Sequence, residues 1–199
     1  MAFFWHLFVF SGLAFAFALI NLIIGLQKGI ERSYLFFGLV SICVGIYYLM
    51  FPFAHVPGGD IYWKIGLSFF IVAFILFPWF IYYYGKCNRL LMPFLLSAGM
   101  ASTLLLFLFS SSSEEIVWWN ALAHLVLIVT TVYGLLAVQN LRQLDGKRSA
   151  ITFFIAIAIF LVLIIDDIVY IHFRELYLFN LPESILPFDY FLFLFMILM

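Results

Sequence analysis

Residues 65–84 have the sequence IGLSFFIVAFILFPWFIYYY, a run of twenty residues without one charged side chain. As an α-helix this run is about 30 Å long, which matches the thickness of the hydrocarbon core of a bilayer. The stretch therefore predicts a membrane-spanning helix. The fold class follows from how often such runs recur along the chain.

Similar apolar runs, separated by short polar segments, occupy most of the 199 residues. Six are long enough to cross a bilayer, and a seventh begins near Ile185. We therefore predict an all-α polytopic membrane protein, a bundle of seven transmembrane helices that forms one domain over residues 1–199. The expected helices are approximately 3–26, 34–56, 61–84, 90–109, 118–139, 150–172 and 185–199.

The composition excludes two broad classes of protein. The chain is 67% hydrophobic and 10% charged, whereas soluble domains are about 45–50% apolar and 25% charged. A net charge of -1 leaves no basic surface for nucleic acid. Cys43 and Cys87 have neither metal-ligand spacing nor an evident pairing, so both are interpreted as ordinary thiols. We predict no metal and no cofactor.

The basic residues predict the orientation of the chain. Seven of the nine lie in the loops after the first, third and fifth expected helices, which should be cytoplasmic by the positive-inside rule. The amino terminus is then outside and the carboxyl terminus cytoplasmic. The last expected helix, of fifteen residues, would reach about 22 Å, which is short of a full crossing. We therefore expect the amino-terminal part of a longer protein, with a tilted or half-inserted last segment as the alternative.

Ionisable groups within the expected spans are the first functional candidates, because they are costly in hydrocarbon. Asp166, Asp167, Tyr170 and His172 lie near the outer end of the sixth span. Adjacent carboxylates diverge by about 100° on a helix, so they are not a ready acid/base pair. Two interpretations stay open, a ligand or proton site and an interfacial helix end.

Histidines give the second group of candidates. His124 lies near the outer end of the fifth span, with Asn120 one turn before it and Thr131 two turns after it on the same face. The imidazole is interpreted either as a ligand-binding or proton-sensing group or as an interhelical hydrogen-bonding group. His6 joins the candidates because it also falls near the outer face. The four histidines lie on different segments without HxxxH spacing, which argues against a metal site.

Smaller polar and aromatic residues predict packing rather than catalysis. Serines within spans commonly permit close contact between helices, and those in the first four spans are Ser11, Ser41, Ser68, Ser97 and Ser102. Asn21 is expected to form an interhelical hydrogen bond. Trp5, Tyr62 and Trp63 cluster with Trp118 and Trp119 at the expected outer interface, where an aromatic belt is typical.

Two longer stretches support a family resemblance. WKIGLSFFIVAFILFPWFIYYYGKCNRL (63–90) and HLVLIVTTVYGLLAVQNLRQLDGKRSAITFF (124–154) resemble the third helix and the fifth-to-sixth hairpin of the amino-terminal seven-helix sensor regions of bacterial histidine kinases and related receptors. The resemblance covers nearly the whole chain, but it lies in the general pattern of apolar helices and short basic loops and not in a diagnostic motif. No binding residue is therefore carried over from it. It implies a multi-pass protein of the bacterial inner membrane.

The same resemblance implies a function in two-component signal transduction. The helical region would detect an external or membrane-dissolved cue, such as a small or apolar ligand, and bias a cytoplasmic kinase through the seventh helix, usually within a homodimer. No catalytic motif occurs within these residues. Two alternatives stay open, a small seven-helix transporter and a membrane-embedded metal-dependent hydrolase.

Overall fold

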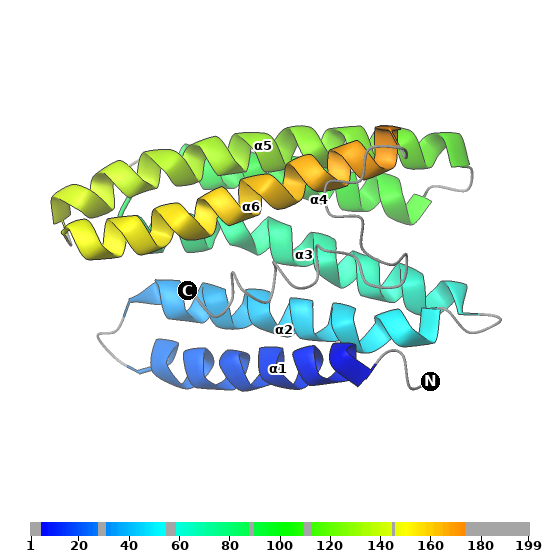
Figure 1. The fold of residues 1–199 in the computed structure, drawn as a ribbon, viewed down its shortest axis with the longest axis horizontal. Helices are drawn as coiled ribbons and strands as arrows, with labels where there is room; N and C mark the ends of the chain where they lie inside the picture. Colours follow the sequence, from blue (N-terminus) through cyan, green and yellow to red (C-terminus); the bar gives the residue numbers. More distant parts are fainter. Residues whose placement is uncertain are drawn as a thin grey trace. The chain divides into compact units, whose positions relative to one another are not determined.

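The computed structural model describes residues 5–27, 31–54, 59–87, 90–109, 113–144 and 146–173, without the side chains of 113–120, 163, 166, 167, 169 and 170–173. All regular secondary structure in these ranges is helical (Figure 1). The chain divides into two compact units, residues 1–123 and 124–199, and each is described by itself. The helices are α1 (Trp5–Gly25), α2 (Arg32–Ala54), α3 (Asp60–Tyr84), α4 (Leu91–Phe109), α5 (Ser113–Leu144) and α6 (Lys147–Phe173).

The prediction of an all-helical fold is confirmed for the described residues, and the helices suggest a membrane protein. Within the described ranges, α1 to α4 and the segment Ala121–Leu144 of α5 are long and apolar enough to cross a bilayer. The predicted seventh helix, 185–199, lies outside the described residues. The observed α5 extends beyond the predicted 118–139 at both ends, because hydropathy marks the part of a helix that suits hydrocarbon and not where the helix stops.

Small residues let α1 and α2 pack closely. A Cβ atom added to Gly38 would lie 2.8 Å from Cγ of Leu22, and one added to Gly45 would lie 3.0 Å from Cε1 of Phe15. Ser11 lies in the same interface and its hydroxyl donates to the carbonyl of Gly45 at 2.9 Å. Side-chain hydrogen bonds of this kind stabilise helix pairs where water is absent.

The other polar groups in the first unit divide between neighbouring helices and their own helix. Ser97 on α4 donates to the carbonyl of Ile75 on α3 at 2.7 Å, which confirms the packing role expected for a serine in a span. Asn21 instead donates to the carbonyl of Phe17, one turn earlier on α1, so the predicted interhelical bond is wrong. In hydrocarbon the carbonyl one turn back is the nearest acceptor for such a short side chain.

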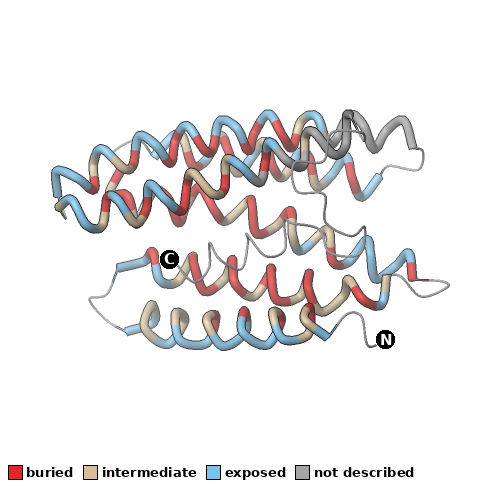
Figure 2. Tube along the Cα trace, in the orientation of Figure 1, coloured by how far each residue is buried: buried red, intermediate tan, exposed pale blue. Residues whose placement is uncertain are grey.

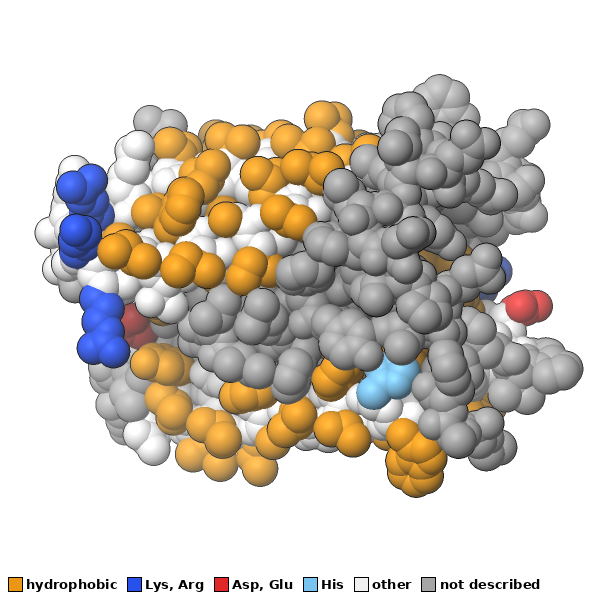
Figure 3. Space-filling view, in the orientation of Figure 1, with side chains coloured by type: hydrophobic (Ala, Val, Ile, Leu, Met, Phe, Trp, Pro, Cys, Tyr) orange, Lys and Arg blue, Asp and Glu red, His pale blue; other side chains and the backbone are white. Residues whose placement is uncertain are grey.

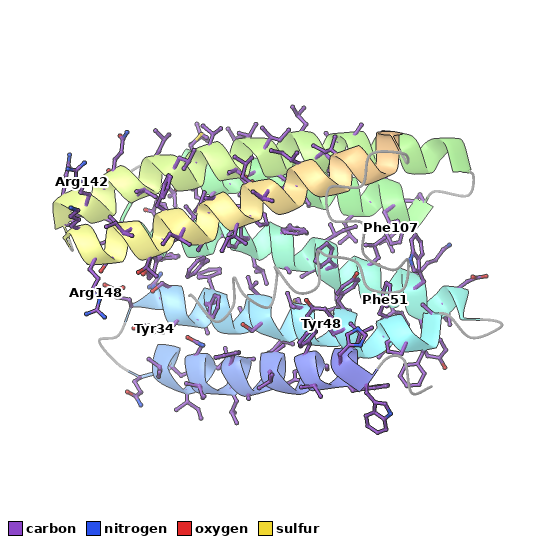
Figure 4. All side chains as sticks on the ribbon, viewed as in Figure 1. Tyr34, Tyr48, Phe51, Phe107, Arg142 and Arg148 are labelled. Carbon is purple, nitrogen blue, oxygen red and sulfur yellow. The ribbon has the colours of Figure 1, made fainter. Side chains whose placement is uncertain are left out.

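Aromatic rings connect α2 to both of its neighbours, α1 and α3. Tyr48 is fully buried, and its ring contacts the rings of Phe10 and Tyr47 at centroid distances of 5.7 and 5.5 Å (Figure 4). Tyr47 in turn contacts Phe70 on α3 at 4.7 Å. Such a continuous aromatic chain supplies large contact areas in preferred tilted geometries. It fixes how α2 lies against both of its neighbours.

The outer faces of the helices are apolar. Buried and exposed positions alternate along each helix (Figure 2), and the space-filling view shows hydrophobic side chains along the helices (Figure 3). In a soluble protein such a surface would drive association, whereas lipid tails cover it at no cost. Trp5, Tyr62 and Trp63 are all exposed near helix beginnings, as an aromatic belt requires.

The carboxyl end of α3 carries an unusual residue. Lys86 has φ 49°, the left-handed conformation that usually belongs to glycine at this position. The backbone N–H groups of Lys86 and Cys87 donate to the carbonyls of Tyr83 and Tyr82, which is the Schellman pattern. The side-chain Nζ of Lys86 lies 3.5 Å from Oε1 of Glu31, the residue just before α2. The strained lysine thus joins two consecutive helices.

Two substitutions at Lys86 separate the strain from the ion pair. Lys86→Gly relieves a left-handed backbone worth about 1 kcal/mol and loses a surface ion pair worth about 0.5 kcal/mol. Lys86→Ala loses the pair and keeps the strain. We expect the glycine variant to be more stable than the alanine variant by about 1 kcal/mol, measured as free energies of unfolding in mixed micelles. Equal stabilities would contradict the role of the backbone conformation.

Candidate functional site

The candidate site lies in the hairpin of α5 and α6. The two helices are joined at Gly146, whose φ of 93° belongs to the left-handed region that a side chain would strain. The N–H of Gly146 donates to the carbonyl of Leu141 at 3.1 Å. Arg142 and Arg148 are exposed at this turn (Figure 4). The hairpin therefore has a basic end, and its polar candidates lie toward the other end.

One close contact fixes the register of the hairpin. A Cβ atom added to Gly134 would lie 2.7 Å from Cδ1 of Ile157, so the two helices approach each other at these positions. Leu144 and Lys147, ten residues nearer the turn on each helix, are the end of α5 and the beginning of α6. The contact and the turn thus indicate the same antiparallel register.

This register brings predicted site residues to one level. Ten residues beyond Gly134 and Ile157, away from the turn, are His124 and Asp167. At about 1.5 Å per residue, both backbone positions lie about 15 Å from the close contact. Asp166 is the adjacent residue of α6. The sequence predicted a similar level for these residues on the two helices, and the register of the hairpin places their backbones at the same level.

His124 is buried in the half of α5 away from the basic turn. Its side chain is 6% exposed, and α5 extends from Ser113 to Leu144. His124 therefore lies about 7 Å from the middle of the helix, toward Ser113. Thr131, two turns further along α5, is also buried and donates its hydroxyl hydrogen to the carbonyl of Leu127. Of the three polar residues predicted to share one face of this helix, the two whose side chains are described, His124 and Thr131, are thus both buried.

The remaining predicted site residues are placed by their helices alone. Asn120 lies one turn before His124 on α5, and Tyr170 and His172 lie in the last two turns of α6. The side chains of these three residues and of Asp166 and Asp167 are not described. His6 belongs to the first unit, where it is half-buried on α1 and its ring contacts that of Phe10 edge-on at 5.9 Å.

Sequence reasoning missed a cluster in the first unit. The guanidinium carbon of Arg32 lies 5.9 Å from the ring centroid of Tyr83, and the Tyr83 ring stacks on Phe36, which stacks on Trp79. The signal was present as two pairs with a spacing of four residues, Arg32 with Phe36 and Trp79 with Tyr83. Residues four apart share a helix face. Only the pairing of α2 with α3 shows that the two faces meet.

Metal ligands do not cluster in the part of the chain that the structure describes. Among the residues that the structure describes, no three His, Cys, Asp or Glu side chains come close enough together to hold a metal ion. Cys43 and Cys87 are buried thiols in the first unit.

No protein-family model, curated protein or solved structure matches this chain.

Proposed function

We propose that this chain is the transmembrane input domain of a bacterial signalling protein of the histidine kinase type. The domain detects an external or membrane-dissolved cue at the end of the α5–α6 hairpin that carries His124. It adopts the seven-helix topology predicted from its basic loops, with an external amino terminus, and works as a homodimer in the inner membrane. A cytoplasmic output receives the signal through the seventh helix.

The burial of His124 in the half of α5 away from the basic turn is the observation that carries the proposal. A buried imidazole level with two carboxylate-bearing residues is expensive in a membrane and is therefore a functional candidate by default. His124 lies in the half of α5 away from the basic turn, on the side that the basic loops predict to be outside. That position supports reception of a cue from outside.

The mechanism is a shift between two helix arrangements. A cue that binds one arrangement more tightly moves the population toward it by its differential affinity, and a cue that binds both equally changes nothing. The packed α5–α6 hairpin connects the level of His124 to the basic turn on the cytoplasmic side. A change at the level of His124 moves this hairpin, and the seventh helix carries the change to the output.

The proposal is tested by removing the polar groups at that level. His124→Ala, Asp166→Asn and Asp167→Asn are introduced into the native polypeptide in its own membranes. We expect each to change signal output at least about fivefold, since coupling between input and output sites is worth about 1–3 kcal/mol. The measurement is transfer of labelled phosphate from ATP to the output protein, normalised to the amount of inserted chain.

Two neighbouring apolar residues serve as matched controls. Leu125 and Ile165 lie beside the tested residues on the same two helices, and their side chains are 59% and 45% exposed. Leu125→Ala and Ile165→Ala should leave the output within about twofold, as exposed substitutions usually change energies by no more than 0.5 kcal/mol. Unchanged output in all three polar variants would refute the proposal. Solute accumulation in vesicles without phosphate transfer would favour a transporter instead.

A further inference from the structure

The side chain of Arg32, at the beginning of α2, is held in place by an aromatic ring. Its guanidinium carbon lies 5.9 Å from the ring centroid of Tyr83, and its Nη1 donates to the Tyr83 hydroxyl at 3.4 Å. The residue is nevertheless exposed. A planar guanidinium that is already oriented loses less freedom when it binds an anion. Arg32 is thus prepared for a ligand that reaches it from outside the protein.

The supporting ring belongs to a larger stack. Tyr83 is nearly parallel to Phe36 at 5.3 Å, and Phe36 is nearly parallel to Trp79 at 6.1 Å. Tyr82 meets Tyr83 edge-on at 5.0 Å. All four rings are half-buried. The stack begins in the last turns of an apolar span, where Trp and Tyr typically lie at the boundary between acyl chains and headgroups.

The charges around the stack favour an anion. Glu31 is the acidic residue next to Arg32, and its carboxylate is paired with Lys86 at 3.5 Å. The ion pair balances that carboxylate, so Arg32 contributes a net positive charge at this end of α2 and α3. The exposed cation therefore sits beside half-buried rings, at the end of two spans. This combination matches a molecule with a phosphate at one end and hydrocarbon at the other.

We propose that Arg32 binds the phosphate of an anionic phospholipid, whose glycerol and upper acyl carbons contact the Phe36, Trp79 and Tyr83 rings. Each basic residue near a bilayer surface attracts anionic lipid by about 1 kcal/mol without any built site. The ring-held guanidinium adds geometry to this attraction, because its fork fits phosphate oxygens. The inference concerns the first unit and does not depend on the proposed signalling function.

The experiment measures binding of fluorescent phosphatidylglycerol to the full chain in neutral detergent micelles. Salt at about 0.5 M shortens the Debye length to roughly 4 Å and suppresses non-specific attraction. We expect Arg32→Gln to weaken binding at least about tenfold, and Arg32→Lys, which keeps the charge but lacks the planar fork, to weaken it about threefold. Unlabelled phosphatidylglycerol should compete, whereas phosphatidylcholine and a large excess of inorganic phosphate should not.

Arg142 provides the matched control, because it is an exposed arginine in the last turn of α5. Arg142→Gln should change binding less than about twofold at this salt concentration. Equal losses in the Arg32 and Arg142 variants would overturn the proposal in favour of general charge attraction. Competition by inorganic phosphate would assign the site to a soluble anion, and no preference over phosphatidylcholine would exclude headgroup recognition. If Arg32→Gln does not fold, the Arg32→Lys result decides alone.

Discussion

Replacing Gly25 by alanine is expected to lower the free energy of unfolding by about 3 kcal/mol, the upper part of the range for overpacked sites. A Cβ atom at Gly25 would lie 2.6 Å from the backbone nitrogen of Leu35 and 2.9 Å from its Cα. Side chains can rotate away from an intruding methyl group, but backbone atoms of a helix cannot. The end of α1 would have to separate from α2, and unfolding in mixed micelles would measure the cost.

Gly12 is the control for this substitution. It lies on the same helix, and a Cβ atom there would have no neighbour within 4 Å. Gly12→Ala should therefore raise stability by about 0.5–1 kcal/mol, because alanine favours a helix over glycine. If both alanine variants were destabilised equally, the close approach of α1 and α2 would not be the cause. We therefore expect Gly25→Ala to lower the free energy of unfolding and Gly12→Ala to raise it, although both positions lie on α1.

The sequence was sufficient for the membrane class and for most helix positions. A span such as 65–84 is recognisable because most residues that face hydrocarbon are apolar and the backbone groups bond within their own helix. Helix ends were less predictable, as α5 shows. Polar residues such as Asn140 and Arg142 lie within α5, which ends at Leu144, shortly before the left-handed Gly146.

The sequence allowed an estimate of the level of His124 and Asp167 along their helices, but not of the contacts of the candidate site. That estimate comes from counting residues, since each helix advances about 1.5 Å per residue. Which residues pack together depends on helix rotation, and an almost uniformly apolar sequence gives a weak signal of rotation. The cluster of Arg32 and Tyr83 escaped prediction for this reason. The expected bond of Asn21 failed because its own helix offered a nearer acceptor.

The register of the α5–α6 hairpin carries the functional proposal, and it can be tested by a double-mutant cycle. Ile157 is fully buried, so Ile157→Ala should cost about 3 kcal/mol through lost packing. Gly134→Ala should cost about 1 kcal/mol, because its methyl group would lie 2.7 Å from Cδ1 of Ile157, whose buried side chain has to shift. Both values are free energies of unfolding of the full chain.

Combining the two substitutions should recover part of the loss. The alanine at position 157 removes the atoms that the methyl group at position 134 would meet, so the double variant should be more stable than the sum of the single effects by at least about 1 kcal/mol. Strict additivity would show that the two positions do not touch. The register that brings His124 level with Asp167 would then fail, and with it the single site for a cue, since residues at different depths cannot respond together to one ligand.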